Sequence, residues 1–230
     1  MGNYDFDSAV IGGGSAGYAT ARTTAAAGKR TVIIEAGGEL GGLCILRGCM
    51  PTKALLHAAD VRHQARRSSI WGLKPDEVSF DFAAVMRRKA AMVEEFASYR
   101  RGQLQDGRFE LIRALARFRD PHTLELDNGK AVTAEHIMIC TGSRVAELPL
   151  PGLTKLGCIT SDDALRLESL PKSIIVLGGG AVALEFAQFF ARFDVEVTLL
   201  QRSPHILKAF DDDGAGEVEA AFRAEGITVH

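Results

Sequence analysis

Apolar residues form short continuous runs that alternate with stretches of helical spacing. The runs Asp7–Ile11 and Thr31–Glu35 are rich in β-branched residues, as is typical of buried parallel strands. Between them, the alanine-rich stretch Ser15–Gly28 predicts a helix that stops at its final glycine. The chain therefore opens with a predicted β–α–β unit.

The same pattern recurs in the second half of the chain. Ser173–Leu177 and Val195–Leu200 are predicted strands, and Ala181–Phe193 is the predicted helix between them. The sequence thus contains a weak internal repeat of two β–α–β units. The other predicted elements are helices Pro51–Ser69, Phe80–Gln103 and Ser161–Leu170, antiparallel meander strands Leu111–Phe118, Thr123–Leu126 and Ala131–Thr133, a parallel-type strand His136–Cys140, and a last strand Ile227–His230.

Proline and glycine at Pro149, Pro151 and Gly152 interrupt this pattern and predict a domain boundary near residue 150. The expected fold class is α/β, with two Rossmann-like dinucleotide-binding domains. Residues 1–150 form the first, which contains the small antiparallel β-meander. Residues 151–230 form the second, which is expected to be incomplete because the chain ends directly after a strand.

Composition narrows the possible functions. The 230 residues are 47% hydrophobic, enough for a core, and the net charge of −2 with dispersed lysines and arginines argues against nucleic-acid binding. An uncharged apolar run of about 18 residues is lacking, which argues against a membrane span. The acidic start lacks the basic and apolar regions of a signal peptide, so a cytoplasmic protein is expected.

The first predicted nucleotide site is Gly12-x-Gly14-x-x-Gly17, which follows a strand and opens a helix. The first glycine permits a tight turn, the second a close approach to a pyrophosphate, and the third close helix packing. The helix start at Ser15 and Ala16 offers backbone N–H groups to the phosphates. At the end of the next strand, Glu35 is placed to bind a ribose diol. The alternative is an ordinary strand-to-helix turn.

The second predicted site is Gly178-x-Gly180-x-x-Ala183. The strand that follows ends in Gln201 and Arg202 rather than in an acid, and an arginine attracts a 2′-phosphate. This favours NADP over NAD, unless Arg202 simply points to solvent. Two dinucleotide folds in one chain suggest a flavin and a nicotinamide that work in series.

Two of the four cysteines, Cys44 and Cys49, lie five residues apart. Five residues rise about 7.5 Å along a helix, more than the usual Cα separation across a disulfide, so a straight helix cannot bridge the pair. Gly48 can supply the required distortion, and a nearby helix N-terminus would lower a thiol pKa. The interpretation is redox chemistry. The alternatives are a zinc site, for which ligands are lacking nearby, and two inert cysteines.

At these residues the chain resembles the FAD- and NAD(P)-dependent disulfide oxidoreductases, which include dihydrolipoamide dehydrogenase, mercuric reductase and glutathione reductase. Gly41–Lys53 is similar to the family pattern G-G-x-C-x-x-x-G-C-x-P-S-K. Thr141-Gly142-Ser143 matches a strand end that contacts FAD in the family. Gly178–Gly180 followed by Glu185 is the third similarity.

The resemblance implies a role for each matching residue. Cys49 would exchange electrons with the flavin, and Cys44 would attack the substrate disulfide. Lys53 would lie by the flavin and pair with Glu185, which would flank the nicotinamide. A cation there stabilises negative charge on the reduced flavin. Three further residues would line the FAD site: Gly42, Thr141 and Gly142.

The expected function is therefore that of a flavin-dependent oxidoreductase acting on a small-molecule or protein-bound disulfide or dithiol, most like dihydrolipoamide dehydrogenase. The alternatives are a mercuric reductase-like enzyme and a non-catalytic nucleotide-binding redox sensor. The family usually has asparagine where this chain has Leu46, and Arg47 is also unusual, so the polarity beside the cysteines differs. Family members are about twice as long and form homodimers through a C-terminal domain, so the chain is expected to be a fragment that is inactive alone.

Overall fold

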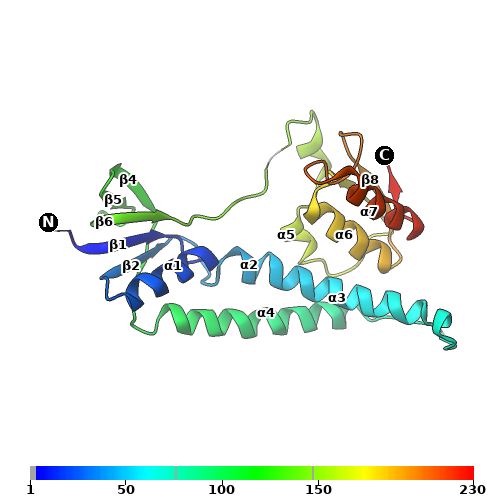
Figure 1. Ribbon diagram of the computed structural model, residues 1–230, viewed down its shortest axis with the longest axis horizontal. Helices are drawn as coiled ribbons and strands as arrows, with labels where there is room; N and C mark the ends of the chain where they lie inside the picture. The colour runs from blue at the N-terminus through cyan, green and yellow to red at the C-terminus, as the bar shows by residue number, and fades with distance from the viewer. Residues whose placement is uncertain (1–3, 76, 147) are drawn as a thin grey trace. The chain divides into compact units, whose positions relative to one another are not determined.

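The structure, a computed structural model, describes residues 4–75, 77–146 and 148–230 (Figure 1). The chain divides into two compact units. The first contains Met1–Met50 and Met92–Leu156, and the second contains Pro51–Ala91 and Gly157–His230. Each unit carries its own parallel strands, as expected for an α/β protein with an internal repeat.

The first unit is built on a six-stranded sheet with the order β3-β2-β1-β6-β5-β4. Its strands are β1 (Phe6–Ile11), β2 (Thr31–Glu35), β3 (Glu110–Arg113), β4 (Ala116–Asp120), β5 (Thr123–Leu126) and β6 (Ala131–Ile139). Strands β3, β2, β1 and β6 are parallel, whereas β4, β5 and β6 form the antiparallel meander.

Three of the predicted strands in this sheet have the wrong bounds. The predicted strand Leu111–Phe118 is divided into β3 and β4, because the chain bends at Ala114 and the two parts pair with different partners. The predicted strands Ala131–Thr133 and His136–Cys140 are one continuous strand, β6. This strand pairs with β5 over its first residues and with β1 along much of its length, which explains its two apolar patterns.

Helix α1 (Ser15–Ala26) packs on the sheet through the face that carries its buried residues Gly17, Tyr18 and Ala21. Tyr18 and Ala21 belong to the same buried cluster as Val10 of β1 and Ile33 of β2. The short helix α2 (Gly42–Leu46), which the sequence analysis did not predict, follows β2 in the chain. Two long helices, α3 (Cys49–Arg66) and α4 (Phe82–Leu104), each contribute residues to both units.

The second unit has a three-stranded parallel sheet in the order β7-β8-β9. Its elements are the strands β7 (Ser173–Leu177), β8 (Glu196–Leu200) and β9 (Thr228–Val229), the helices α5 (Ser161–Ala164), α6 (Ala181–Arg192) and α7 (Asp212–Ala224), and the single 3-10 turn η1 (Ser68–Trp71). A second 3-10 turn, η2 (Leu153–Leu156), belongs to the first unit. An aromatic cluster that includes Phe189 and Phe190 of α6 fills the core together with Leu55 of α3. Helix α7 was not predicted.

Helix α5 is much shorter than the predicted Ser161–Leu170. Its first turn is closed by a capping box, in which the N–H of Thr160 donates to the Asp163 carboxylate at 2.8 Å. Its C-terminal carbonyl, that of Leu165, accepts a hydrogen bond from the ammonium of Lys89, a residue of α4 in the same unit. Because a distant side chain satisfies this carbonyl, the helix can end after one turn.

Candidate active site

The loop between β1 and α1 leaves no room for side chains at two of its glycines. Gly12 has a φ of 103°, and a Cβ atom on it would lie 2.3 Å from the carbonyl oxygen of Cys140, the residue after β6. A Cβ atom on Gly17 would lie 1.7 Å from the carbonyl oxygen of Gly12. Both positions therefore require glycine, for the backbone turn and for the close packing of α1 on the loop.

Glu35, at the end of β2, holds this loop in place. Its Oε2 atom accepts a hydrogen bond from the N–H of Gly13 at 2.6 Å, and its Oε1 atom accepts one from the N–H of Gly37 at 2.6 Å. A carboxylate can accept about four hydrogen bonds, so capacity remains for a ribose diol. Glu35 was predicted only as a ribose ligand, and its role in holding the loop was not predicted.

The N-terminus of α1 is open. Gly14 is its N-cap residue, no side chain caps the helix, and Ser15 and Ala16 are exposed. Gly42 has a φ of 74°, and a Cβ atom on it would lie 2.4 Å from Gly14 Cα, so two bare backbones meet here. A helix N-terminus lined by glycine backbone fits the pyrophosphate of a dinucleotide.

Thr141 and Gly142 follow β6 at the same edge of the sheet. The N–H of Cys140 donates to the carbonyl oxygen of Ile11 at 2.8 Å, which ties the end of β6 to the end of β1. Because parallel neighbouring strands end at one edge, Thr141 follows β6 at the same edge of the sheet at which the Gly12 loop follows β1. Both Thr141 and Gly142 are exposed, and their contact with FAD stays a prediction.

The two cysteines lie on either side of a helix break. Cys44 is in the middle of α2, Cys49 is the first residue of α3, and Arg47 and Gly48 separate the two helices. A Cβ atom on Gly48 would lie 2.8 Å from a Leu43 methyl carbon and 3.0 Å from the Leu43 carbonyl oxygen, so the break is tightly packed. The C-x4-C spacing required such a break. The predicted start of the helix at Pro51 is wrong by two residues, because Cys49 already belongs to α3.

The thiols are free and in contact. The Cys44 thiol interacts with the side chains of Cys49 and Ser15. Burial raises the pKa of Cys44, and the hydrogen bond and charge of Cys49 raise it further, whereas the Ser15 hydroxyl and the Cys49 backbone lower it. For Cys44 the net direction is therefore upward, so a lowering by a helix N-terminus does not apply to this thiol. It lies inside a five-residue helix, where the dipole is weak, and burial dominates.

The second glycine loop repeats the geometry of the first. Gly178 also has a φ of 103°, and Gly180 is the N-cap of α6 without a side-chain cap. The N–H of Gly179 donates to Gln201 Oε1 at 3.0 Å, across the same 22-residue separation that joins Gly13 to Glu35. Gln201 therefore replaces Glu35 as the acceptor that holds the loop.

The chain after β8 closes over this second loop. The N–H of Leu207, which has a φ of 53°, donates to the carbonyl oxygen of Gly179 at 2.7 Å, and Ile206 is fully buried. Arg202 is exposed, whereas Ala183 is partly buried in the first turn of α6. The contribution of Ile206 and Leu207 to the shape of this loop was not predicted, since neither residue is polar.

Lys53 of α3 and Glu185 of α6, both in the second unit, form an ion pair between Nζ and Oε1. The structure therefore brings together two residues that lie 132 positions apart in the sequence. Their side chains are 60% and 32% exposed, so the pair is accessible to a ligand. The predicted site residues thus form one group in each unit: the first loop with the cysteines, and the second loop with the ion pair.

Within residues 4–75, 77–146 and 148–230, no helix is both long and apolar enough to cross a membrane. Across the same described ranges, no three or more histidine, cysteine or acidic side chains gather as a set that could hold a metal ion.

Comparison with known proteins identifies relatives over almost the whole chain. A family model described as pyridine nucleotide-disulphide oxidoreductase matches residues 6–230. The chain is 33% identical over 229 residues to a mercuric reductase from Bacillus cereus, covering 99% of this chain and 36% of the relative. It is 34% identical over 223 residues to a dihydrolipoyl dehydrogenase from Geobacillus stearothermophilus, covering 96% and 47%.

A solved structure agrees with these relatives. The HOCl-induced flavoprotein disulfide reductase RclA from Escherichia coli superposes with a TM-score of 0.83 and 31% identity, covering 97% of this chain and 48% of that chain. The chain thus spans half the length, or less, of these relatives.

Proposed function

Because this chain belongs to the pyridine nucleotide-disulphide oxidoreductase family, we propose that it forms part of a flavin-dependent disulfide or dithiol oxidoreductase. Bound FAD would carry electrons between NAD(P)H and the Cys44–Cys49 pair. The observation that carries this proposal is the contact of the two free thiols across the α2–α3 break, next to a glycine loop whose backbone fits a pyrophosphate. The relatives are longer than this chain, so the activity of a full-length protein is also part of the proposal.

The first loop would hold FAD. The N–H groups at the start of α1, with Gly12, Gly14 and Gly17, would bind its pyrophosphate, and Glu35 its ribose. Gly42, Thr141 and Gly142 would line the remaining site. Bound FAD supplies a two-electron carrier between a hydride donor and a dithiol.

The cysteines would act in sequence on a disulfide. The Cys44 thiolate attacks one sulfur of the substrate, forms a mixed disulfide and releases the first thiolate. The Cys49 thiolate then attacks Cys44 in this mixed disulfide, which releases the second thiolate and forms the Cys44–Cys49 disulfide. Burial, which raises the pKa of Cys44, disfavours the thiolate form that this attack requires.

The second loop would hold the nicotinamide dinucleotide. Gly178, Gly180 and Ala183 would receive its pyrophosphate at the N-terminus of α6. Gln201 supports a preference for NADP. Its side-chain oxygen accepts the hydrogen bond from the N–H of Gly179 but carries no negative charge, which would repel a 2′-phosphate. The exposed Arg202 would add attraction. Lys53, paired with Glu185, would keep a positive charge beside the flavin.

The substrate proposal is a small-molecule or protein-bound disulfide or dithiol, in line with the dihydrolipoyl dehydrogenases among the relatives. A second candidate is reduction of a soft metal ion, because several relatives of similar identity are named mercuric reductase. A cytoplasmic location, and a homodimer for a full-length relative, stay predictions.

The test is an anaerobic visible spectrum of FAD-reconstituted protein before and after stoichiometric NADPH or NADH. We expect reduction to produce a long-wavelength thiolate-to-flavin band, and a Cys49→Ser variant to bind flavin without giving this band. A Cys44→Ser variant, which should keep the band, is the matched control. If the flavin binds and is reduced but no variant-sensitive band forms, the proposed role of Cys49 is wrong.

A further inference from the structure

Helices α3 and α6 are joined by a series of ion pairs that share one register. Lys53 pairs with Glu185, and Asp60 pairs with Arg192. In both contacts the partner lies 132 residues further along the chain. All four residues belong to the second unit, so the contacts lie within one compact body.

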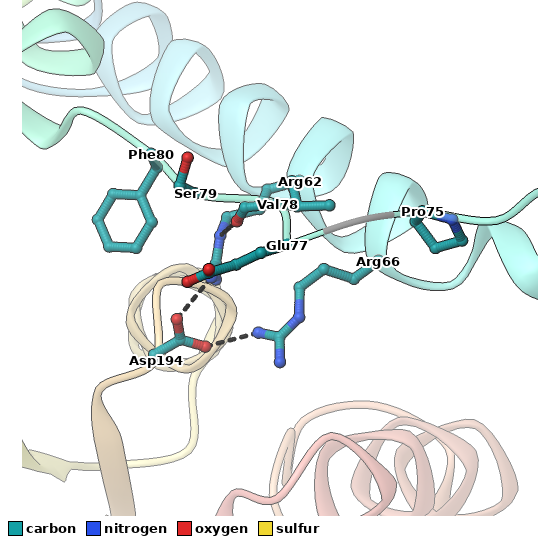
Figure 2. A pocket seen from close by; sticks show the side chains of 8 residues that line it. All are labelled: Arg62, Arg66, Pro75, Glu77, Val78, Ser79, Phe80 and Asp194. Carbon is teal, nitrogen blue, oxygen red and sulfur yellow. Dashed lines mark hydrogen bonds and ion pairs between the residues drawn. The ribbon is translucent and has the colours of Figure 1, made fainter.

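A third contact repeats the same separation at the end of the two helices. Arg62 Nη2 lies 2.5 Å from Asp194 Oδ2, again across 132 residues. The other oxygen of Asp194 lies 2.6 Å from Arg66 Nη1, and Figure 2 shows both arginines pointing to this carboxylate. Arg62 also donates to the carbonyl oxygen of Arg192, at the end of α6. Because the separation is constant, α3 and α6 run in the same direction side by side.

The strength of these contacts is unequal. The Lys53–Glu185 pair is largely exposed, and an exposed pair holds two helices only weakly. In contrast, the Arg192 side chain is 13% exposed, and it also makes two hydrogen bonds of 2.7 Å to Glu225, which is 14% exposed. Arg62 is 8% exposed and stacks over Phe80, with its guanidinium carbon 4.6 Å from the ring centroid.

The order of charges also opposes a shifted register. Moving α3 by seven residues, which is about two turns, would place Lys53 opposite Arg192 in one direction. In the other direction it would place Asp60 opposite Glu185. Each shift exchanges an attraction for a repulsion between like charges, so the observed register is the one that all three pairs satisfy.

The Asp194 backbone supports a specific role for this residue. It has a φ of 64°, a left-handed conformation that is uncommon for a residue with a side chain. The cavity of about 490 Å³ in Figure 2 opens beside it, between Arg66 and the segment that includes Ser79 and Phe80. A glycine would suit this backbone better, but it would lose both ion pairs.

We propose that Asp60 and Asp194 are positioning residues, whose ion pairs to Arg192 and to Arg62 and Arg66 fix α3 against α6 and so hold Lys53 against Glu185. The meaning of this placement rests on the proposed function, in which Lys53 serves the flavin and Glu185 the nicotinamide. The placement itself concerns only residues of this chain and can be tested without either cofactor.

A zero-length carbodiimide cross-link measures the placement directly, because it joins the Lys53 amine to the Glu185 carboxylate only when the two are in contact. The yield of this cross-linked peptide is quantified by mass spectrometry in the unmodified chain and in Asp60→Asn and Asp194→Asn variants. We expect each variant to reduce the yield roughly two- to fivefold, the range allowed by the usual strength of such pairs, and the double variant to reduce it further. Asparagine tolerates the left-handed backbone at residue 194.

Two controls separate positioning from general loss of stability. Glu219→Gln removes an ion pair to Arg223 within α7 of the same unit and should leave the yield unchanged. Asp60→Glu keeps the charge and should restore most of the yield. An unchanged yield in the double variant, or an equal loss in the Glu219→Gln control, would overturn the proposal. Failure of the proposed function appears elsewhere, as the absence of NAD(P)H-dependent flavin reduction in a chain that still forms the cross-link.

Discussion

A single methyl group at Gly17 tests how the first nucleotide loop is built. In Gly17→Ala, the new Cβ atom would lie 1.7 Å from the carbonyl oxygen of Gly12. An ordinary carbon–oxygen contact is roughly twice that length, so the start of α1 must move by about 1.5 Å or the loop must open. Both groups in the clash are fixed to backbone, so no side chain can rotate away.

We therefore expect Gly17→Ala to lower the free energy of unfolding by about 3 kcal/mol, the upper end of the range for overpacking. The matched control is Gly180→Ala in the second loop, where a Cβ atom would meet nothing within 4 Å. That variant should cost less than about 1 kcal/mol, since it changes only the N-cap residue of α6.

The assay is urea unfolding followed by far-ultraviolet circular dichroism, with amide hydrogen exchange in β1 and α1 as the local measurement. Hydrogen exchange is needed because two compact units need not unfold in one step. If Gly17→Ala matches the control in both measurements, the close packing of α1 on the Gly12 carbonyl is not what holds this loop.

Three further predictions follow from the charges and thiols of the two units. Gln201→Glu keeps a hydrogen-bond acceptor for the N–H of Gly179 but adds a negative charge that repels a 2′-phosphate. The ratio of NADP affinity to NAD affinity, measured by equilibrium titration, should therefore fall about tenfold. An unchanged ratio would show that residue 201 does not determine which dinucleotide binds. Burial acts to raise the pKa of Glu225, but the hydrogen bonds and charge of Arg192 lower it, so the net direction is down. The resulting contribution to stability is present above the unfolded pKa of this carboxyl and is lost as the pH falls through its folded pKa. Thermal unfolding from pH 7 to pH 3 should therefore show a steeper acid loss for the unmodified chain than for Glu225→Gln, and parallel curves would contradict the ion pair. The raised pKa of Cys44 predicts slow alkylation by iodoacetamide at pH 8 and a rate that still rises above pH 9, measured by peptide mass spectrometry; a rate that is already constant at pH 8 would contradict it.

Site residues could be predicted from the sequence where the chemistry depends on residue types at fixed spacing within one short segment. Glycines at fixed offsets after an apolar run, and two cysteines separated by four residues, are properties of short segments. The C-x4-C spacing excluded a straight helix, and the structure has the break between α2 and α3 at Arg47 and Gly48. The raised pKa of Cys44 could not be found from the sequence, because it is caused first by burial, which depends on how the chain packs.

Strand partners were harder to predict. Residues 111–118 are one apolar stretch in the sequence, yet β3 pairs with β2 and β4 pairs with β5. Strand β6 serves both a parallel and an antiparallel neighbour. Alternation along a strand reports which face is buried, but it carries no information on which strand lies beside it.

The sequence by itself determined the two β–α–β units, the glycine loops and the cysteine motif, because each rests on backbone conformation and side-chain type over a few residues. Only the tertiary structure decided that Glu35 and Gln201 hold the loops they follow, and that α3 and α6 share one register from Lys53 to Asp194. These contacts join residues separated by 22 and by 132 positions. They exist because packing of the core brings distant charges and backbone groups to hydrogen-bonding distance.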